Sequence, residues 1–158
     1  MAIRIVMIDI LVQGKIKMLK YNEKNISDVV VKNDERYTVK DNTILKNLVL
    51  SSTALNAGKA TSGHTHKGQE EIYFFIRGEG EMVVDKERFP VEKGDVVLIP
   101  DGAFHQVINT QKPLGPHQTT STIPKDNTLV FNCVFDGSRD QKKNFWNLVA
   151  AGIKNRLI

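Results

Sequence analysis

Two stretches of the sequence decide the fold: residues 58–78, which read GKATSGHTHKGQEEIYFFIRG, and residues 94–109, which read GDVVLIPDGAFHQVIN. The first has the form Gly, five residues, His-x-His, four residues, Glu, six residues, Gly. The second has the form Gly, five residues, Pro-x-Gly, two residues, His, three residues, Asn, and fifteen residues separate the two. Glycine adopts positive φ without strain, so the fixed glycines mark places where the chain reverses between short strands.

Four residues of these stretches have side chains that bind metal ions: His64, His66, Glu71 and His105. His64 and His66 are two positions apart, so both project from one face of an extended strand. Glu71 follows a polar turn that lets its strand return beside the first, and His105 follows a Pro-x-Gly turn. Three imidazoles and a carboxylate suit Fe(II), Mn, Ni, Co, Cu or Zn, so the sequence leaves the identity of the metal open. Such a facial set of ligands leaves two coordination positions open for water or substrate.

Both stretches match the paired signature motifs of the cupin family at every fixed position, and the sequence resembles that family over residues 45–136. The resemblance implies an all-β fold, the double-stranded β-helix or jelly-roll barrel. It also implies one divalent transition metal ion held by His64, His66, Glu71 and His105. Glu70 competes for the carboxylate position, but only Glu71 keeps the six-residue gap to the next glycine, and Glu70 is expected to point outward.

The rest of the chain is expected to fall into three parts. Residues 1–44 are predicted to form N-terminal strands and an irregular arm, 45–136 the barrel, and 137–158 a C-terminal helix. The barrel prediction has support of its own, because no helical periodicity interrupts the middle of the chain and turn residues recur about every ten positions. Residues 110–126 contain three prolines and no apolar periodicity. This long loop is either a functional lid or a surface insertion.

The two ends of the chain carry apolar segments that need a partner. Residues 3–12 and 15–19 are predicted to be extra strands, which in many small cupins lie along the barrel edge or cross to a second subunit. Ser138 and Gln141 fit a capping box. An amphipathic helix is predicted to follow, with apolar residues at helical spacing: Trp146, Val149, Ala150, Ile153 and Leu157. Its apolar face would pack on the barrel exterior or on a second subunit.

Tyr73 is the candidate catalytic residue. It lies two positions after Glu71 and therefore on the same face of the strand, where a phenol beside a divalent cation can act as a general base. The alternative is a pocket-wall residue hydrogen-bonded to Glu71 or water. The other candidate pocket residues are three apolar side chains and a histidine of the long loop: Phe75, Phe104, Val107 and His117. Cys133 is expected to pack in the core.

Three functions fit such a site. The first is metal-assisted proton abstraction from a small polar or anionic molecule, as in cupin isomerases and epimerases of sugar derivatives and in cupin lyases that act on dimethylsulfoniopropionate. The Glu-x-Tyr arrangement of those lyases looks like Glu71-Ile72-Tyr73 here. The second is Fe(II)-dependent dioxygenase chemistry, and the third is a non-enzymatic cupin that binds a small molecule.

Composition limits the partners. The net charge of +4 (22 − 18) is spread over single lysines without an arginine-rich patch, so nucleic acid is not expected as a partner. Residues 3–12 are too short to cross a bilayer, and no signal-peptide cleavage site follows, so no membrane partner is expected. Cys133 is the single cysteine, which favours a reducing compartment and hence the cytoplasm. A homodimer is expected, because the apolar ends suit a subunit contact.

Overall fold

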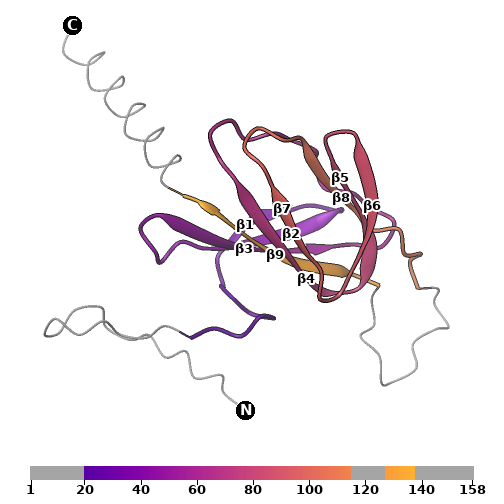
Figure 1. Cartoon of the computed structure of the whole chain (residues 1–158). Coiled ribbons are helices and arrows are strands. Elements are labelled where there is room, and N and C mark those ends of the chain that lie inside the picture. Colours follow the sequence, from indigo (N-terminus) through magenta and orange to yellow (C-terminus); the bar gives the residue numbers. More distant parts are fainter. Residues whose placement is uncertain (1–19, 115–126, 138–158) are drawn as a thin grey trace, which may run out of the picture.

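A computed structural model describes residues 20–114 and 127–137, which contain strands and no helix (Figure 1). The all-β prediction is thereby confirmed for the described residues. Their strands are β1 (Val30–Asn33), β2 (Tyr37–Asn42), β3 (Leu48–Leu55), β4 (Glu71–Arg77), β5 (Glu79–Val84), β6 (Glu87–Glu92), β7 (Val96–Ile99), β8 (His105–Ile108) and β9 (Leu129–Asp136).

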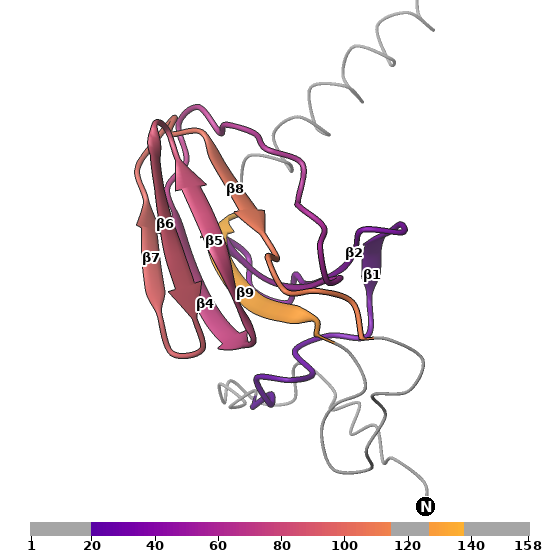
Figure 2. The same ribbon diagram turned by 90° about the vertical axis from the view of Figure 1, so that its right-hand side faces the viewer.

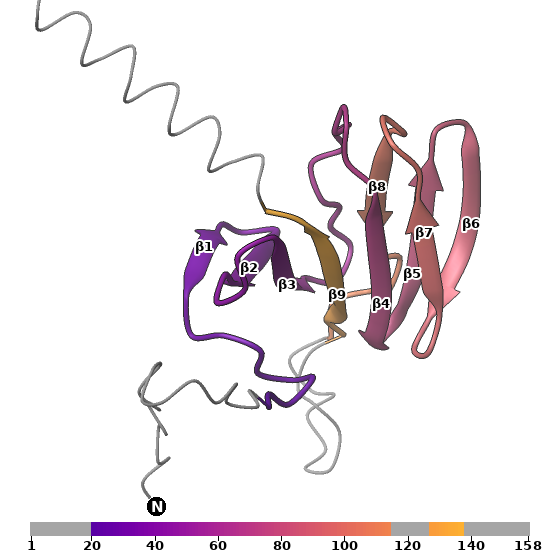
Figure 3. The same ribbon diagram turned by 60° about the vertical axis from the view of Figure 1, so that its left-hand side comes forward.

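The strands form two antiparallel sheets. One has six strands in the order β1-β2-β3-β9-β4-β7, which can be followed across Figure 3. The other has three strands in the order β6-β5-β8, and Figure 2 shows it in front of β4 and β9. Strands far apart in sequence are neighbours, since β9 pairs along its length with β3 and with β4. Side chains between the two sheets make the core.

Alternation of side chains sets the inward face of β4. Glu71, Tyr73 and Phe75 are buried, whereas Ile72 and Phe74 are 38% and 37% exposed. This period of two is the pattern of a strand with one buried face, and a slip of one residue would reverse it. The core that β4 joins also contains Leu55, Met82, Val91, Ile99, Val107, Leu129, Phe131 and Cys133.

Two strands precede the predicted barrel and belong to its larger sheet. β2 pairs with β3 from Tyr37 opposite Leu55 to Asn42 opposite Leu50, and β1 pairs with β2. Part of the region predicted as N-terminal strands and an irregular arm therefore extends the six-stranded sheet. The division of the chain at 44/45 and 136/137 stays a prediction. The strands predicted before residue 20, the loop residues 115–126 and the helix predicted after Gly137 lie outside the described residues.

The fixed glycines of both motifs adopt positive φ, as the sequence predicts: Gly58, Gly78, Gly94 and Gly102. Gly78, with φ +85°, turns the chain from β4 into β5 and also lies close to another strand. A Cβ at this position would lie 3.1 Å from the carbonyl oxygen of Thr128. Glycine is therefore needed at residue 78 for both backbone conformation and space.

Candidate metal centre

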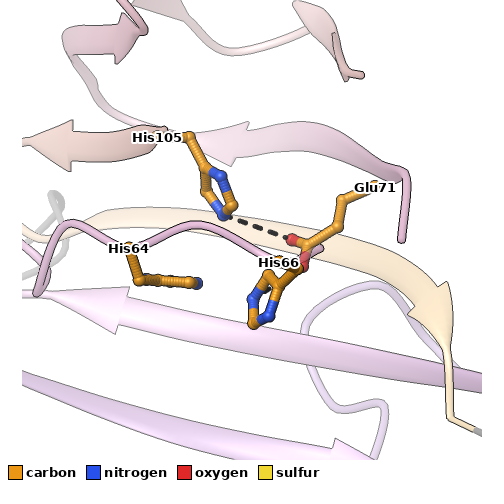
Figure 4. Close-up of side chains that lie close together, drawn as sticks. All are labelled: His64, His66, Glu71 and His105. Atoms are coloured by element: carbon orange, nitrogen blue, oxygen red, sulfur yellow. Dashed lines mark ion pairs between the residues drawn. The ribbon is translucent and has the colours of Figure 1, made fainter. Parts of the chain in front are cut away.

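His64, His66, Glu71 and His105 lie together at one end of the barrel, and Figure 4 shows their side chains pointing toward one another. Each offers one ligand atom, and these atoms all lie within 4.8 Å of one another. Glu71 bridges two histidines: its Oε1 is 3.1 Å from His66 Nε2, and its Oε2 is 3.6 Å from His105 Nε2. The four predicted ligands thus converge around one point.

Backbone contacts between distant segments bring these residues together. His64 and His105 form an antiparallel bridge, with the amide of His64 3.2 Å from the carbonyl of His105 and the reverse pair at 3.0 Å. The carbonyl of His66 accepts a bond from the amide of Gly102 at 3.0 Å. Gly102 lies in the turn between β7 and β8, and His105 follows it as the first residue of β8, so this turn positions both histidines of the first motif.

The loop between His66 and Glu71 is fixed by one carboxylate. Asp101 Oδ1 accepts hydrogen bonds from the amides of Gly68 and Gln69. Asp101 is the variable residue of the Pro-x-Gly turn, so the second motif holds the loop of the first. Sequence reasoning did not find this role, although an aspartate beside a glycine in a turn is a typical amide acceptor.

Two histidines present Nε2 to the centre. Nδ1 of His64 is 2.8 Å from the carbonyl oxygen of Ser62, and Nδ1 of His105 is 3.1 Å from that of Ala103. A carbonyl can only accept a hydrogen bond, so Nδ1 donates, and in the neutral ring Nε2 then keeps its lone pair. Metal-binding histidines are oriented in this way, by a backbone carbonyl on the other ring nitrogen.

Burial differs within the group. Glu71 is 4% and His105 2% exposed, whereas His64 is exposed and the side chain of His66 is 34% exposed. Burial lowers the pKa of His105, with His64 acting in the same direction, although the Ala103 carbonyl and Glu71 oppose the shift. A neutral His105 has a lone pair to give to a metal.

The arrangement fits a divalent transition metal. His105 Nε2 is buried and has no hydrogen-bond partner among the described residues. A buried polar atom left unsatisfied destabilises a fold by about 1–3 kcal/mol, and such atoms are rare. A cation between His105, Glu71 and the two exposed histidines would satisfy it with a nitrogen and oxygen ligand set of the usual kind.

Tyr73 lies directly behind the ligands. Its side chain is 6% exposed, and its ring centroid is 5.7 Å from that of His105 and 5.5 Å from that of Phe131. Burial, reinforced by Cys133 and Glu71, raises the pKa of the phenol well above its usual value near 10. Without a cation, Tyr73 therefore keeps its proton at neutral pH.

The structure places the remaining predicted pocket residues in different surroundings. Phe75 and Val107 are buried in the core at 2% and 1% exposure. Phe104 is half-buried, and its ring packs so closely on Gly63 that a Cβ there would lie 2.3 Å from a ring carbon. His117 lies outside the described residues. Glu70 is exposed, in agreement with its predicted outward direction.

A polar network from β2 supports the first histidine of the cluster. The Ser62 hydroxyl lies 3.3 Å from Tyr37 Oη and accepts a hydrogen bond from Arg36 at 3.2 Å. Ser62 also provides the carbonyl that orients His64. No spacing rule links β2 to the metal motif, so the sequence held no signal for this contact.

Comparison with known proteins agrees with the fold and with the motifs. The cupin-domain family model matches residues 52–114. An uncharacterized protein of Methanocaldococcus jannaschii, MJ1618, is 33% identical over 84 residues, which are 46% of this chain and 67% of that protein. The oxalate-binding protein of Thermotoga maritima is 34% identical over 56 residues, which are 35% of this chain and 46% of that protein.

Solved structures share the architecture at low sequence identity. KdgF from Halomonas sp. superposes with a TM-score of 0.55 at 16% identity, covering 77% of this chain and 96% of that one. TT1209 from Thermus thermophilus gives a TM-score of 0.57 at 20% identity, covering 75% and 97%. These two likenesses concern the fold alone. With the family model and the two motifs, they define the class: the chain belongs to the cupin family. Within it, the chain is a small cupin with a His-His-Glu-His cluster of the metal-binding kind.

Proposed function

We propose that this cupin binds one divalent transition metal ion on His64, His66, Glu71 and His105 and uses it to act on a small polar or anionic molecule. The observation that carries the proposal is the convergence of four ligand atoms within 4.8 Å, one of them a buried imidazole nitrogen that has no hydrogen-bond partner among the described residues. When bound, the cation supplies Lewis acidity, which polarises an oxygen-containing ligand and acidifies its neighbouring C–H bond.

The distribution of exposure gives the direction of ligand entry. Glu71 and His105 lie at the bottom of the site, on the first residues of β4 and β8, whereas His64 and His66 reach solvent. A small molecule therefore approaches from the side of the two exposed histidines. The net charge of +4 favours an anion over a cation as this ligand.

Tyr73 is the residue proposed to move a proton. Its buried ring packs against the rings of His105 and Phe131, so its position is fixed. Positive charge at the site favours the phenolate and opposes the upward pKa shift caused by burial. Tyr73 Oη would then take a proton from the substrate carbon. Return of the proton to another carbon gives an isomerase, return to the opposite face of the same carbon gives an epimerase, and loss of a leaving group gives a lyase.

A second function is a binding module without turnover. One relative is named as an oxalate-binding protein, and its identity with this chain is 34%. A dicarboxylate such as oxalate has two oxygens that suit two open coordination positions, and it has no C–H bond for a base to attack. Binding of this kind needs the four ligands but not a proton carried by Tyr73.

Elemental analysis of the purified protein, followed by Tyr73→Phe, separates these functions. Under proton abstraction, Tyr73→Phe keeps the metal content and loses turnover of hydroxy acids or sugar derivatives in a screen. Tyr21→Phe is the matched control, because it removes the same hydroxyl from a tyrosine that is 45% exposed and away from the core. If Tyr73→Phe retains full turnover, Tyr73 is not the general base.

Two further assays test the alternatives. Calorimetric binding of oxalate that requires metal, with no product from any compound of the screen, supports the binding module. Oxygen consumption with Fe(II) and not with Zn supports a dioxygenase, and turnover without oxygen excludes it. The homodimer and the cytoplasmic location remain predictions from the sequence. Among the described residues, no helix has the length and apolar character needed to cross a membrane.

A further inference from the structure

An open groove with an apolar wall lies where β9 ends. Its volume is about 550 Å³. Its apolar side includes Leu48 and Ile72, which are 46% and 38% exposed, together with Val134. Ile72 pairs with Val134 on one side and with Leu98 on the other, and Leu98 is 68% exposed. The apolar surface therefore continues from the groove across β4 to β7, the last strand of the sheet.

Carboxylates also line the groove. Glu70, Asp101 and Asp136 all border it, and Glu70 and Asp136 are exposed. Within residues 20–114 and 127–137, no lysine or arginine side chain belongs to the lining. A segment that fills the groove should accordingly combine an apolar stripe with positive charge.

The chain itself supplies such a segment. It leaves the sheet at Gly137, whose amide donates to the carbonyl of Asn47 at 2.9 Å, so residues 138–158 begin at the edge of the groove. Their first positions include Arg139, Lys142 and Lys143. An apolar stripe at helical spacing follows: Trp146, Val149, Ala150, Ile153 and Leu157.

The length is also sufficient. Residues 138–158 would span about 30 Å as a helix at 1.5 Å per residue. The apolar surface from β3 across β9 and β4 to β7 covers three strand spacings, about 14 Å at 4.8 Å each. We infer that residues 138–158 of the same chain dock on this surface, with the positive residues at the carboxylates and the apolar stripe over Leu48, Ile72 and Leu98.

Docking would affect the candidate metal centre through the loop between His66 and Glu71. Gln69 is buried, and its Nε2 donates to the carbonyl of Asp136 at 3.2 Å, next to the point where the segment begins. Gly68, Gln69 and Glu70 connect His66 to Glu71 and border the groove. The docked segment covers this loop, so it also restrains two of the four metal ligands. This consequence rests on the proposed metal function, whereas the docking itself does not.

The single tryptophan tests the docking directly. Trp146 lies in the segment, so its fluorescence in the full chain reports only on that part of the molecule. We expect emission shifted to the blue of the urea-unfolded protein and protection from acrylamide. Leu48→Lys should move both toward the unfolded values, while Val31→Lys, at a 53% exposed position on β1 outside the groove, should leave them unchanged.

Charge reversal provides a variant that leaves the barrel untouched. Lys142→Glu with Lys143→Glu should raise acrylamide quenching of Trp146, whereas Lys154→Glu, distant from the carboxylates in the docked arrangement, should not. Emission of the wild-type protein at the unfolded wavelength overturns the inference, and so does equal quenching in Leu48→Lys and Val31→Lys. If docking holds and a metal binds, Leu48→Lys should also release the metal to a chelator faster. Unchanged release with shifted fluorescence would refute the link to the metal loop and leave the docking intact.

Cross-linking identifies the molecule that provides the segment. In Leu48→Cys with Val149→Cys, a short bismaleimide should give an internally linked chain of monomer mass on a denaturing gel. The background is low because Cys133 is buried. Val31→Cys with Val149→Cys is the control and should remain unlinked. A product of dimer mass would place a second copy in the groove and overturn docking within one chain.

Discussion

The stability of this protein should depend on a divalent cation through Glu71. The four ligand atoms meet only in the folded chain, so the cation binds the native state and leaves the unfolded state unaffected. At a free metal concentration 100 times the Kd, this stabilises the fold by about 2.7 kcal/mol. For a chain of this size, that corresponds to a rise of roughly 10 °C in Tm.

The near-isosteric variant Glu71→Gln tests the reasoning quantitatively. It removes the negative charge of a carboxylate that faces both His66 and His105. We expect a Kd at least about 100-fold weaker, so at the same metal concentration the stabilisation falls to about 0.4 kcal/mol, or roughly 1–2 °C. Glu70→Gln is the matched control, because Glu70 is the adjacent exposed carboxylate and should keep the full shift.

The assay is thermal unfolding followed by circular dichroism, after dialysis against a chelator and then with one metal at a time. The wild type and Glu70→Gln should gain stability with the cognate metal, while Glu71→Gln should not. The prediction that a cation stabilises the fold is wrong if none of Fe(II), Mn, Co, Ni, Cu or Zn raises the wild-type Tm. It is equally wrong if the two glutamate variants exchange their behaviour, because the inward carboxylate would then be Glu70.

Four other outcomes follow from the described geometry. Burial raises the pKa of the Cys133 thiol far above its ordinary value, so Ellman's reagent should react with it only after urea unfolding; rapid reaction in the native protein would contradict its buried position. Hydrogen bonds from Arg36 hold the pKa of Asp34 at about 2, below its usual 3.8, so its contribution to stability is present above the usual value and lost as pH falls toward the lower one. Asp34→Asn should accordingly flatten the decline of the urea midpoint in that acid range, and an unchanged slope would rule this out. Gly80→Ala places a Cβ 2.3 Å from a backbone oxygen and should lower the free energy of unfolding by about 1–3 kcal/mol, which a wild-type urea midpoint would disprove. Asn109→Ala removes the amide that donates to the carbonyls of Leu55 and Asn127 and should lose about 1–3 kcal/mol by the same measurement, whereas a loss well below this would mean that water replaces the amide.

Much of the candidate site could be predicted because it depends on local periodicity. A strand places alternate residues on one face, so the spacing of Glu71 and Tyr73 was enough to put both inside and Glu70 outside. The positive φ values of the motif glycines follow from the same kind of local argument. His64, His66 and His105 required the family resemblance as well, because their convergence depends on segments about forty residues apart.

The parts that could not be predicted depend on contacts between segments without a shared pattern. β2 is mostly polar and only partly buried. No alternation of apolar residues therefore predicted that Tyr37–Asn42 would extend the larger sheet. Asp101 and Ser62 act through amide and carbonyl groups of other segments, and such groups are present at every residue. Only the three-dimensional arrangement shows which of them are used.

The unequal burial of the four ligands gives the site a route for exchange. Glu71 and His105 are anchored on strands, while His64 and His66 sit on an irregular, solvent-facing segment. Displacement of that segment alone would free half of the coordination sphere, and local opening of this kind needs far less free energy than global unfolding. Glu71 and His105 would stay in place, so a bound ion could be exchanged for another while the barrel remains folded. The identity of a bound metal ion would then depend on which metals are available to the protein.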